Sequence, residues 1–459
     1  MIVIVLLSLI IVTGCTRNTA QELDPADIDW AHYNALAESF VMAFMSGDYD
    51  AAADMFDRDM TRLMGASGLQ KFRPDIIARA GSFVSIYDID NFTAEGYIIC
   101  NVTMLHEDSA SVLRVVFSVD DQVAGLFIID YPELPDTDEA SSEPVQRNGF
   151  TDYPITIGEG TDFPLRGIFS IPDGSAVPVP AVVLVHGSGP SNMDGVPAAL
   201  ANFPNKPFRD IADHLAANGI AVIRYNKRTL THGIRFPKGA TVWEETIEDA
   251  IFAADILRAD PRIDENNIFI IGHSLGGMLA PRIHAEGGDF AGLILLAGSP
   301  RSLLDIIRDQ NIDYVNANME GEEKEVALAS LTEEMWNAMV VEPIMNMPAD
   351  EAKTTPSGFG ASVYYEQDLL NHPAIDYINN ITQPFLILQG SADFQVTVER
   401  DFAKFQEIFA HRSNATLKVY EGLNHLFMVS TTGTIDEYEI PGNVDRRVLE
   451  DIVEWIKAQ

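Results

Sequence analysis

Short runs of mainly apolar residues alternate with longer amphipathic segments between residues 180 and 420, and this alternation strongly limits the folds open to the chain. The runs are AVVLVHG, IAVIRYN, IFIIGHS, GLILLAG, PFLILQG and TLKVYEG. Runs without a polar alternation indicate strands buried on both faces of a parallel sheet. A helical segment between two of them begins at Pro207 and ends before Gly219, as helices prefer. We therefore expect an α/β domain with a doubly wound, mostly parallel sheet and a ligand site at the carboxyl ends of its strands.

The chain of 459 residues is long enough for a second domain, and its N-terminal part has a different pattern. Apolar residues recur at helical spacing over residues 30–45, and a second helical segment spans residues 50–63. Residues 83–130 contain strand patterns separated by short polar turns. Helices followed by a run of antiparallel strands predict a small α+β domain over residues 26–131.

A segment rich in Pro, Ser and acidic residues separates the two patterns. Residues 132–149 are predicted to be a linker, and residues 150–459 are predicted to form the α/β domain. More than eighty residues of charged, helical pattern lie between the runs GLILLAG and PFLILQG. Because a bare loop of that length is uncommon in a compact domain, residues 299–383 are predicted to form a helical cap over the strand ends.

The pentapeptide Gly272-His273-Ser274-Leu275-Gly276 lies between the run IFIIG and a helical segment. It has the G-x-S-x-G pattern of a nucleophile elbow, in which a serine lies on a sharp turn between a strand and a helix. Small residues two positions before and two after the serine leave room for that turn. The following helix also brings unpaired N–H groups near the serine hydroxyl. We therefore predict that Ser274 is a catalytic nucleophile.

A serine hydroxyl needs a general base, and with this elbow the partners follow in the order serine, acid, histidine. Four histidines follow Ser274 at a distance that permits this role: His284, His372, His411 and His425. The first lies on the helix leading away from the elbow, the second in the predicted cap and the third at a helix end. Only His425, in EGLNHLF, follows the last strand pattern. We therefore predict His425 as the base.

The acidic partner is expected after the preceding strand. Asp393 lies three residues beyond Gly390, at the end of PFLILQG. A carboxylate there would accept the Nδ1 proton of His425 and fix its tautomer. Asp305 falls in the predicted cap, and Glu421 is too close to His425 in sequence to face it readily. Asp393 is therefore the predicted orienting residue.

Taken together, the elbow, the acid after Gly390 and the final histidine resemble the α/β-hydrolase superfamily over residues 150–459. The stretch HGSGP…NKPFRDIADHLAANGIAVIRYNKRT is similar to bacterial carboxylesterases related to the bile-acid and acyl-CoA thioester hydrolase branch. The resemblance implies an α/β-hydrolase fold and a serine esterase acting on small-molecule carboxylic esters through an acyl-enzyme. An acyl thioesterase or a serine peptidase would use the same triad, and both stay open as alternatives.

The resemblance also implies an oxyanion hole in the loop His186-Gly187-Ser188-Gly189-Pro190, which follows AVVLV. Its donors are expected to be the backbone N–H groups of Ser188, with Gly189 as the alternative, and of Leu275. His186 is expected to brace this loop. No metal-binding cluster, Walker loop or dinucleotide fingerprint occurs, so the sequence implies no metal and no cofactor.

One basic cluster occurs, in IRYNKRTLTHG at residues 223–233. Its basic residues are Arg224, Lys227 and Arg228. Two interpretations stay open. The cluster braces a loop through salt bridges with Asp194 or Asp210, or Lys227 or Arg228 meets a carboxylate or carbonyl group of the substrate.

The first residues, MIVIVLLSLIIVTGC, form an apolar run of the size of a signal-peptide core. Val12-Thr13-Gly14-Cys15 resembles the bacterial lipobox, although no Lys or Arg precedes the run. The resemblance implies a lipoprotein signal peptide over residues 1–15, a lipidated Cys15, and export to the outer face of the cytoplasmic membrane. A signal anchor and a plain cleaved peptide are the alternatives. MSGDYDAAADMF and its surroundings resemble a nuclear-transport-factor-2-like domain of bacterial lipoproteins, which brings no catalytic residues.

The charge balance limits the partners. The chain carries 30 basic and 68 acidic residues, a formal net charge of −38. Such an acidic protein is repelled by phosphate backbones, so nucleic-acid binding is excluded, and membrane contact is expected only through the lipid anchor. A different class of function, an anchored binding lipoprotein with an incidental triad, is the non-enzymatic alternative.

Overall fold

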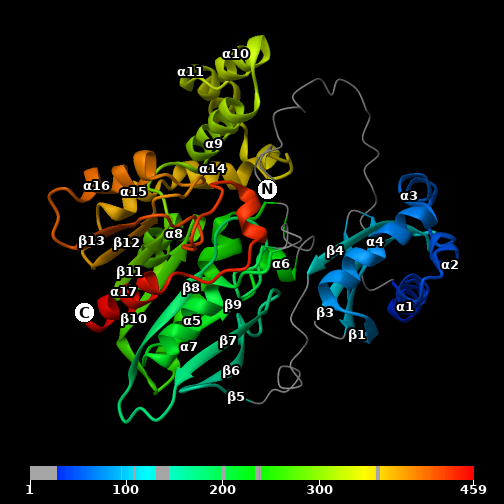
Figure 1. The fold of residues 1–459 in the computed structure, drawn as a ribbon, viewed down its shortest axis with the longest axis horizontal. Coiled ribbons are helices and arrows are strands. Elements are labelled where there is room, and N and C mark those ends of the chain that lie inside the picture. The colour runs from blue at the N-terminus through cyan, green and yellow to red at the C-terminus, as the bar shows by residue number, and fades with distance from the viewer. Residues whose placement is uncertain are drawn as a thin grey trace. The chain divides into compact units, whose positions relative to one another are not determined.

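The computed structural model describes residues 28–94, 96–106, 110–130, 144–197, 203–232, 237, 239–357 and 362–459. These residues form two compact units, with residues 28–130 in one and residues 144–459 in the other (Figure 1). The predicted signal peptide with Cys15, and most of the predicted linker, lie outside the described residues.

The N-terminal unit packs helices against a four-stranded antiparallel sheet of order β1-β2-β3-β4. Its elements are α1 (Trp30–Ser46), α2 (Tyr49–Ala53), α3 (Arg58–Leu63), α4 (Gly65–Ala80), β1 (Phe83–Ala94), β2 (Tyr97–His106), β3 (Ala110–Phe117) and β4 (Val123–Asp130). Phe40 and Phe44 of α1 and Val102 and Val115 of the sheet share one buried core. The predicted α+β class is therefore confirmed.

Two details of the helices differ from the prediction. The second helical segment is divided into α2 and α3, and α4 follows it although no helix was predicted there. Pro74 lies inside α4, and Gly68 lies in its first half. Both residues oppose a helix on local grounds. The helix forms because Leu69 and Ile76 are buried in the core of the unit. The stabilisation comes from packing against other elements, and helix propensity of the local sequence does not include it.

The second unit has, among its described residues, a nine-stranded sheet of order β13-β12-β11-β10-β8-β9-β7-β6-β5. The strands are β5 (Val145–Gln146), β6 (Phe150–Ile157), β7 (Leu165–Pro172), β8 (Val179–Val185), β9 (Ala221–Tyr225), β10 (Ile263–His273), β11 (Gly292–Leu296), β12 (Phe385–Gly390) and β13 (Ala415–Tyr420). The strands from β13 to β9 are parallel, and β7, β6 and β5 pair antiparallel at one edge. This is the predicted doubly wound, mostly parallel sheet.

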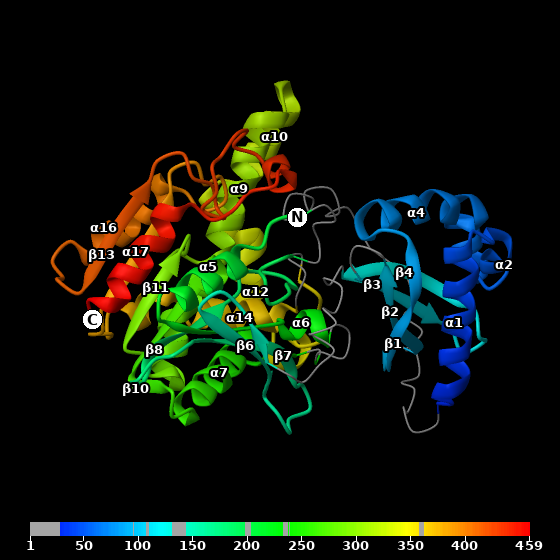
Figure 2. The same ribbon diagram turned by 60° about the horizontal axis from the view of Figure 1, so that its bottom comes forward.

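Helices cover both faces of this sheet, which explains the uninterrupted apolar runs. Val183 and Val185 belong to a core shared with α7 (Glu248–Ala259) and α8 (Leu275–Ile283). Val182 and Leu184 belong to a second core shared with α5 (Pro207–Ala217) and α17 (Arg446–Lys457). Figure 2 shows α7 on one side of the strands and α5 and α17 on the other. Alternate residues of one strand thus enter two different cores.

The interval between β11 and β12 is helical, as predicted for the cap. It contains α9 (Leu303–Asn318), α10 (Gly321–Ser330), α11 (Glu333–Trp336), η5 (Asn337–Val341), α12 (Glu342–Asn346), α13 (Ala349–Ala352), α14 (Val363–Asn371) and α15 (Ala374–Ile378). Figure 1 shows α9, α10 and α11 extending away from the sheet. Leu304, Val315, Trp336 and Ile344 form a small core within this interval.

The boundary of the predicted linker needs a correction. Val145 and Gln146 form the edge strand β5, which pairs with Asp152 and Thr151 of β6. The last residues of the predicted linker therefore belong to the sheet. No helix in the described part of the chain is long and apolar enough to cross a membrane.

Candidate active site

Ser274 lies on a strained turn between β10 and α8. Its φ of 55° and ψ of −117° lie in a region that residues other than glycine rarely adopt. A Cβ atom at Gly272 would lie 2.2 Å from the carbonyl oxygen of Gly276, and one at Gly276 would lie 2.4 Å from that of Val185. Only glycine fits at both positions, because the opposing atoms are backbone. The Ser274 N–H donates to the carbonyl oxygen of Leu296 over 2.9 Å and ties the turn to β11.

His425 and Asp393 meet in the loops that follow β13 and β12. The distance from His425 Nδ1 to Asp393 Oδ2 is 2.7 Å, and both residues are buried. An ionised carboxylate only accepts hydrogen bonds, so Nδ1 is the donor of this contact, and in the neutral ring Nε2 then has the free lone pair. The structure thus brings together the two residues that the sequence paired, in the tautomer that a general base requires.

Asp393 is held by more than His425. Gln389 Nε2 donates to Oδ2 over 2.8 Å, and the backbone N–H groups of Gln395 and Val396 donate to Oδ1 over 2.8 and 3.0 Å. Each carboxylate oxygen therefore receives two hydrogen bonds. This arrangement gives both carboxylate oxygens their donors and leaves the carboxylate one orientation. Gln389 is a residue that the sequence reasoning missed, although it lies in the strand motif just before Gly390.

His273 joins the elbow to the loop that carries His425. Its Nε2–H donates to the carbonyl oxygen of His425 over 2.9 Å, and the two rings lie 4.7 Å apart between centroids. Burial lowers the pKa of His273 to about 3, with a smaller contribution from His425, so the ring stays neutral. The sequence reasoning assigned no role to His273, and its position next to Ser274 was the available signal.

The predicted oxyanion loop lies directly against the elbow. A Cβ atom at Gly187 would lie 3.1 Å from the Cβ atom of Ser274, so the Gly187 backbone borders the nucleophile. Leu275, the other predicted donor, is the first residue of α8. His186 Nε2–H donates to the carbonyl oxygen of Asn192 over 2.9 Å, and burial lowers the His186 pKa to about 3. His186 therefore braces the loop as a neutral ring, as expected.

The other candidate histidines and acids lie in different surroundings. His284 Nδ1 accepts from the N–H of Phe290 over 3.0 Å, and His372 Nδ1 lies 2.8 Å from the carbonyl oxygen of Asp368. Asp305 accepts from Ser302 in the first turn of α9. His411 and Glu421 are exposed. None of these contacts involves His425 or Ser274.

Lys227 and Arg228 require a correction, because neither side chain is placed to meet a substrate. Both are about 2% exposed. Lys227 Nζ lies 2.9 Å from the carbonyl oxygen of Gly187 and 3.0 Å from Glu245 Oε1. Arg228 pairs with Asp249 and, over 2.8 Å, with Glu248. A buried cation is stable only when it is paired with acceptors such as these carboxylates. The acceptors already bind the ammonium group of Lys227 and the guanidinium group of Arg228, which a substrate would otherwise contact.

The alternative interpretation of the basic cluster agrees with the structure in part. Arg224 Nε donates to Asp194 Oδ1 over 3.0 Å, as expected for a salt bridge that braces a loop. Asp210 instead accepts from the N–H of Val444 over 2.9 Å and from Asn443. The cluster is therefore a brace, and most of its carboxylate partners differ from the predicted ones.

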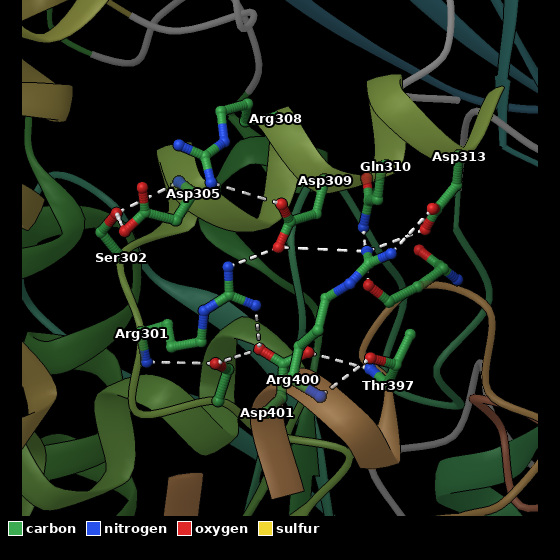
Figure 3. A network of polar contacts seen from close by, with 12 residues as sticks. Arg301, Ser302, Asp305, Arg308, Asp309, Gln310, Asp313, Thr397, Arg400 and Asp401 are labelled. Atoms are coloured by element: carbon green, nitrogen blue, oxygen red, sulfur yellow. Dashed lines mark hydrogen bonds and ion pairs between the residues drawn. The ribbon is translucent and has the colours of Figure 1, made fainter. Parts of the chain in front are cut away.

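A polar network ties the cap to the segment that follows Asp393 (Figure 3). Arg400 donates to both carboxylate oxygens of Asp313 in α9, each over 2.8 Å. Asp401 accepts from Ser299 and Arg301 at the start of the cap and from the N–H of Thr397. The Asp401 pKa is raised because the carboxylate is buried. The network anchors the first cap helix beside the acid loop.

Among the described residues, no group of three or more His, Cys, Asp or Glu side chains could hold a metal ion.

Comparisons with known proteins show the family of the chain. The model of the alpha/beta hydrolase family matches residues 182–436, and a family described as a protein of unknown function (DUF3887) matches residues 37–126. The chain is 32% identical to esterase EstD of Thermotoga maritima over 419 residues, which cover 91% of this chain and 93% of EstD. It is 24% identical to monoglyceride lipase of Mus musculus over 219 residues, 45% of this chain and 65% of the lipase.

Solved structures of esterases also align with the chain. Est1E from Butyrivibrio proteoclasticus has a TM-score of 0.41 and 15% identity, and the alignment covers 66% of this chain and 96% of Est1E. The Pyrococcus furiosus esterase Pf2001 has a TM-score of 0.40 and 17% identity, with 67% of this chain and 93% of the esterase covered.

Proposed function

Because the chain belongs to the α/β-hydrolase family, we propose that Ser274, His425 and Asp393 are the catalytic triad of a serine esterase that cleaves carboxylic esters. The esterase class itself follows from the similarity to EstD over nearly the whole of both chains. The observation that carries the assignment of the triad is the 2.7 Å contact of His425 Nδ1 with Asp393 Oδ2, in a loop that His273, the residue before Ser274, holds through the carbonyl oxygen of His425.

In the first half-reaction, Ser274 Oγ attacks the ester carbonyl carbon while His425 Nε2 accepts the hydroxyl proton. The contact with Asp393 keeps the His425 proton on Nδ1, so Nε2 is free to accept. The carboxylate then stabilises the imidazolium by its charge. Neutral His273 donates to the backbone carbonyl oxygen of His425, and this contact helps to fix the position of the His425 backbone from which the imidazole ring extends.

The tetrahedral intermediate carries its negative charge on the former carbonyl oxygen. Leu275 follows Ser274 in the chain, and Ser188 follows Gly187, whose backbone borders Ser274; the N–H groups of Leu275 and Ser188 would donate to that oxygen. Collapse breaks the bond to the alcohol, which leaves with the proton from His425 Nε2. A water molecule, deprotonated by the same nitrogen, then attacks the acyl-enzyme and releases the carboxylic acid.

Fluorophosphonate labelling together with Ser274→Ala tests this proposal. The wild-type protein should react with the probe and hydrolyse a short-chain chromogenic ester. Ser274→Ala should fold with the same melting temperature, resist the probe, and lose on the order of 10⁶ in turnover. Retention of a few per cent of activity by the pure variant would remove Ser274 from the mechanism.

Within the family, we propose that the substrate chemistry is that of the bacterial carboxylesterases related to the bile-acid and acyl-CoA thioester hydrolases. The stretch HGSGP…NKPFRDIADHLAANGIAVIRYNKRT supports this placement. An acyl thioesterase or a peptidase would use the same steps with a different leaving group. A matched ester, thioester and anilide that share one acyl group separate the three, and the ester should give the highest kcat/KM.

We also propose that Cys15 is lipidated and that the enzyme works outside the cytoplasmic membrane. The supporting observation is the apolar run that ends in Val12-Thr13-Gly14-Cys15. A lipoprotein cysteine carries more than one acyl chain, and two chains anchor a protein stably. Expressed in a bacterium, the wild type should fractionate with membranes, and Cys15→Ser should not. Mass spectrometry that finds an unmodified N-terminus before or beyond Cys15 would refute the proposal.

A further inference from the structure

Lys227, which follows β9, contacts the predicted oxyanion loop. Lys227 Nζ donates to the carbonyl oxygen of Gly187 over 2.9 Å, while the backbone N–H of the same residue donates to that of Ser191 over 3.0 Å. One residue therefore holds the loop at both ends of the segment 187–191. Next to it, the side chain of Asn226 accepts from the N–H of Met193 over 2.8 Å.

The contact with Gly187 bears on catalysis because of the geometry of the peptide group. The carbonyl of Gly187 and the N–H of Ser188 belong to one planar trans peptide and point in opposite directions. Fixing the direction of that carbonyl therefore fixes the direction of the Ser188 N–H. This peptide lies at the nucleophile, since a Cβ atom at Gly187 would lie 3.1 Å from the Cβ atom of Ser274.

We infer that Lys227 is a positioning residue of the oxyanion hole, which turns the Gly187–Ser188 peptide so that its N–H faces the oxygen on which charge develops. The inference rests on the proposed function, because it takes Ser188 as an oxyanion donor. Without the ammonium group, the Gly187 carbonyl loses a buried donor, and the peptide is free to rotate and turn its N–H away. Such a rotation weakens binding of the transition state more than binding of the ester.

The cap takes part in holding Lys227. Glu245, in η3 (Trp243–Ile247), lies 3.0 Å from Lys227 Nζ through Oε1 and accepts from Tyr365 of α14 through Oε2 over 2.6 Å. Lys227 and Glu245 are buried, and Tyr365 is partly buried. A continuous chain of contacts therefore runs from the cap through two buried charges to the oxyanion loop, and the cap helps to set the position of the ammonium group.

The test is the double variant Lys227→Met/Glu245→Gln, which removes both charges so that neither is left buried without a partner. We expect kcat to fall about 10²-fold, near the lower end of the loss seen when one oxyanion donor is removed, with KM within about threefold of wild type. An alkylboronic acid, whose adduct with the serine places an oxygen in the hole, should bind more weakly by a similar factor. A merely structural role would change stability without changing the ratio of the boronic acid Ki to KM.

The matched control is Arg282→Met/Asp368→Asn, which removes a buried ion pair between α8 and the same cap helix without touching the oxyanion loop. It should lower the melting temperature and leave the ratio of Ki to KM unchanged. If the first double variant does not fold, Lys227→Gln replaces it, because its shorter amide stays beside Glu245 but cannot also reach Gly187.

An unchanged ratio in a folded Lys227 variant overturns the inference. If only the inference about Lys227 fails, the wild type is still labelled by a fluorophosphonate and Ser274→Ala is still inactive. If the proposed function fails, those two results fail as well, so the two failures are distinguishable.

Discussion

Asp393→Asn is the substitution whose outcome the structure determines most sharply. Oδ2 of Asp393 receives hydrogen bonds from His425 and Gln389, and Oδ1 receives them from the N–H groups of Gln395 and Val396. An amide has one oxygen and one NH₂ group. Whichever way the asparagine turns, its NH₂ faces two groups that now donate.

The two orientations differ in cost. If the NH₂ faces Gln395 and Val396, two buried backbone donors lose their acceptor, at about 1–3 kcal/mol each. If it faces His425 and Gln389, the imidazole can shift its proton to Nε2, and Gln389 keeps the carbonyl oxygen of Val396 as an acceptor at 2.8 Å. The second orientation is therefore favoured. His425 Nε2 then carries a proton and cannot accept one from Ser274, so turnover should fall about 10⁴-fold while stability falls by only about 1–3 kcal/mol.

Single-turnover and steady-state kinetics on a chromogenic ester measure the turnover of Asp393→Asn, and urea unfolding of the same samples measures its stability. Asp305→Asn is the matched control, since its carboxylate accepts a local hydrogen bond from the hydroxyl of Ser302, to which the Asp305 backbone N–H donates in the first turn of α9. It should keep the wild-type kcat. Asp393→Asn retaining a tenth of wild-type turnover, or Asp305→Asn proving the more damaging, would refute the reasoning.

Three further outcomes follow from the described residues. Burial raises the pKa of Glu366 from 4.5 to about 7, so its folded form holds a proton more tightly than its unfolded form and stability falls as pH rises through that interval. In urea unfolding, the free energy of unfolding of Glu366→Gln should therefore exceed that of the wild type by about 3 kcal/mol near pH 8 and by almost nothing near pH 4. An equal difference at both pH values would show that the raised pKa of Glu366 is not the cause. Gly276→Ala should cost about 3 kcal/mol or more, because its Cβ would lie 2.4 Å from backbone; wild-type stability by thermal melting would show that the turn relaxes. A chain that begins at Pro144 keeps β5 and should hydrolyse a small ester at close to the full-length rate, and a folded but inert product would assign the N-terminal unit a part in the site.

The parts of the fold that the sequence predicted are those with a strong local signal. β8 and the second half of β10, the run IFIIG, are mainly apolar because both of their faces are buried, and that pattern can be recognised without knowing the partners. α4 was missed because Gly68 and Pro74 weaken its local signal, while the burial that stabilises it comes from other elements. β5 was missed because Val145 and Gln146 form a strand only through pairing with β6. The composition of the segment gives no sign of that pairing.

The same division applies to the site. Asp393 and His425 each follow a strand, and chain order and strand ends are sequence properties, so their contact could be predicted, as could the position of Ser274 on the turn after β10. The contact of His273 could not, because it depends on which backbone atom of a loop 152 residues away comes within reach, and that of Gln389 could not, because it depends on how the chain turns after Gly390. The partners of such side chains are set by three-dimensional packing, which leaves no recurring pattern in the sequence from which they could be predicted.

The ion pairs of the basic cluster are consistent with the charge balance of the chain. With 68 acidic residues against 30 basic ones, a cation that becomes buried has carboxylates in ample supply, and leaving it unpaired would be costly. The buried cations Arg224, Lys227, Arg228 and Arg282 are each paired with at least one carboxylate. Basic residues at the strand ends of so acidic a protein are therefore expected to brace loops. In this chain the braced loop is the one that carries Ser188, so the cluster acts on the ester through the backbone and not through its own charges.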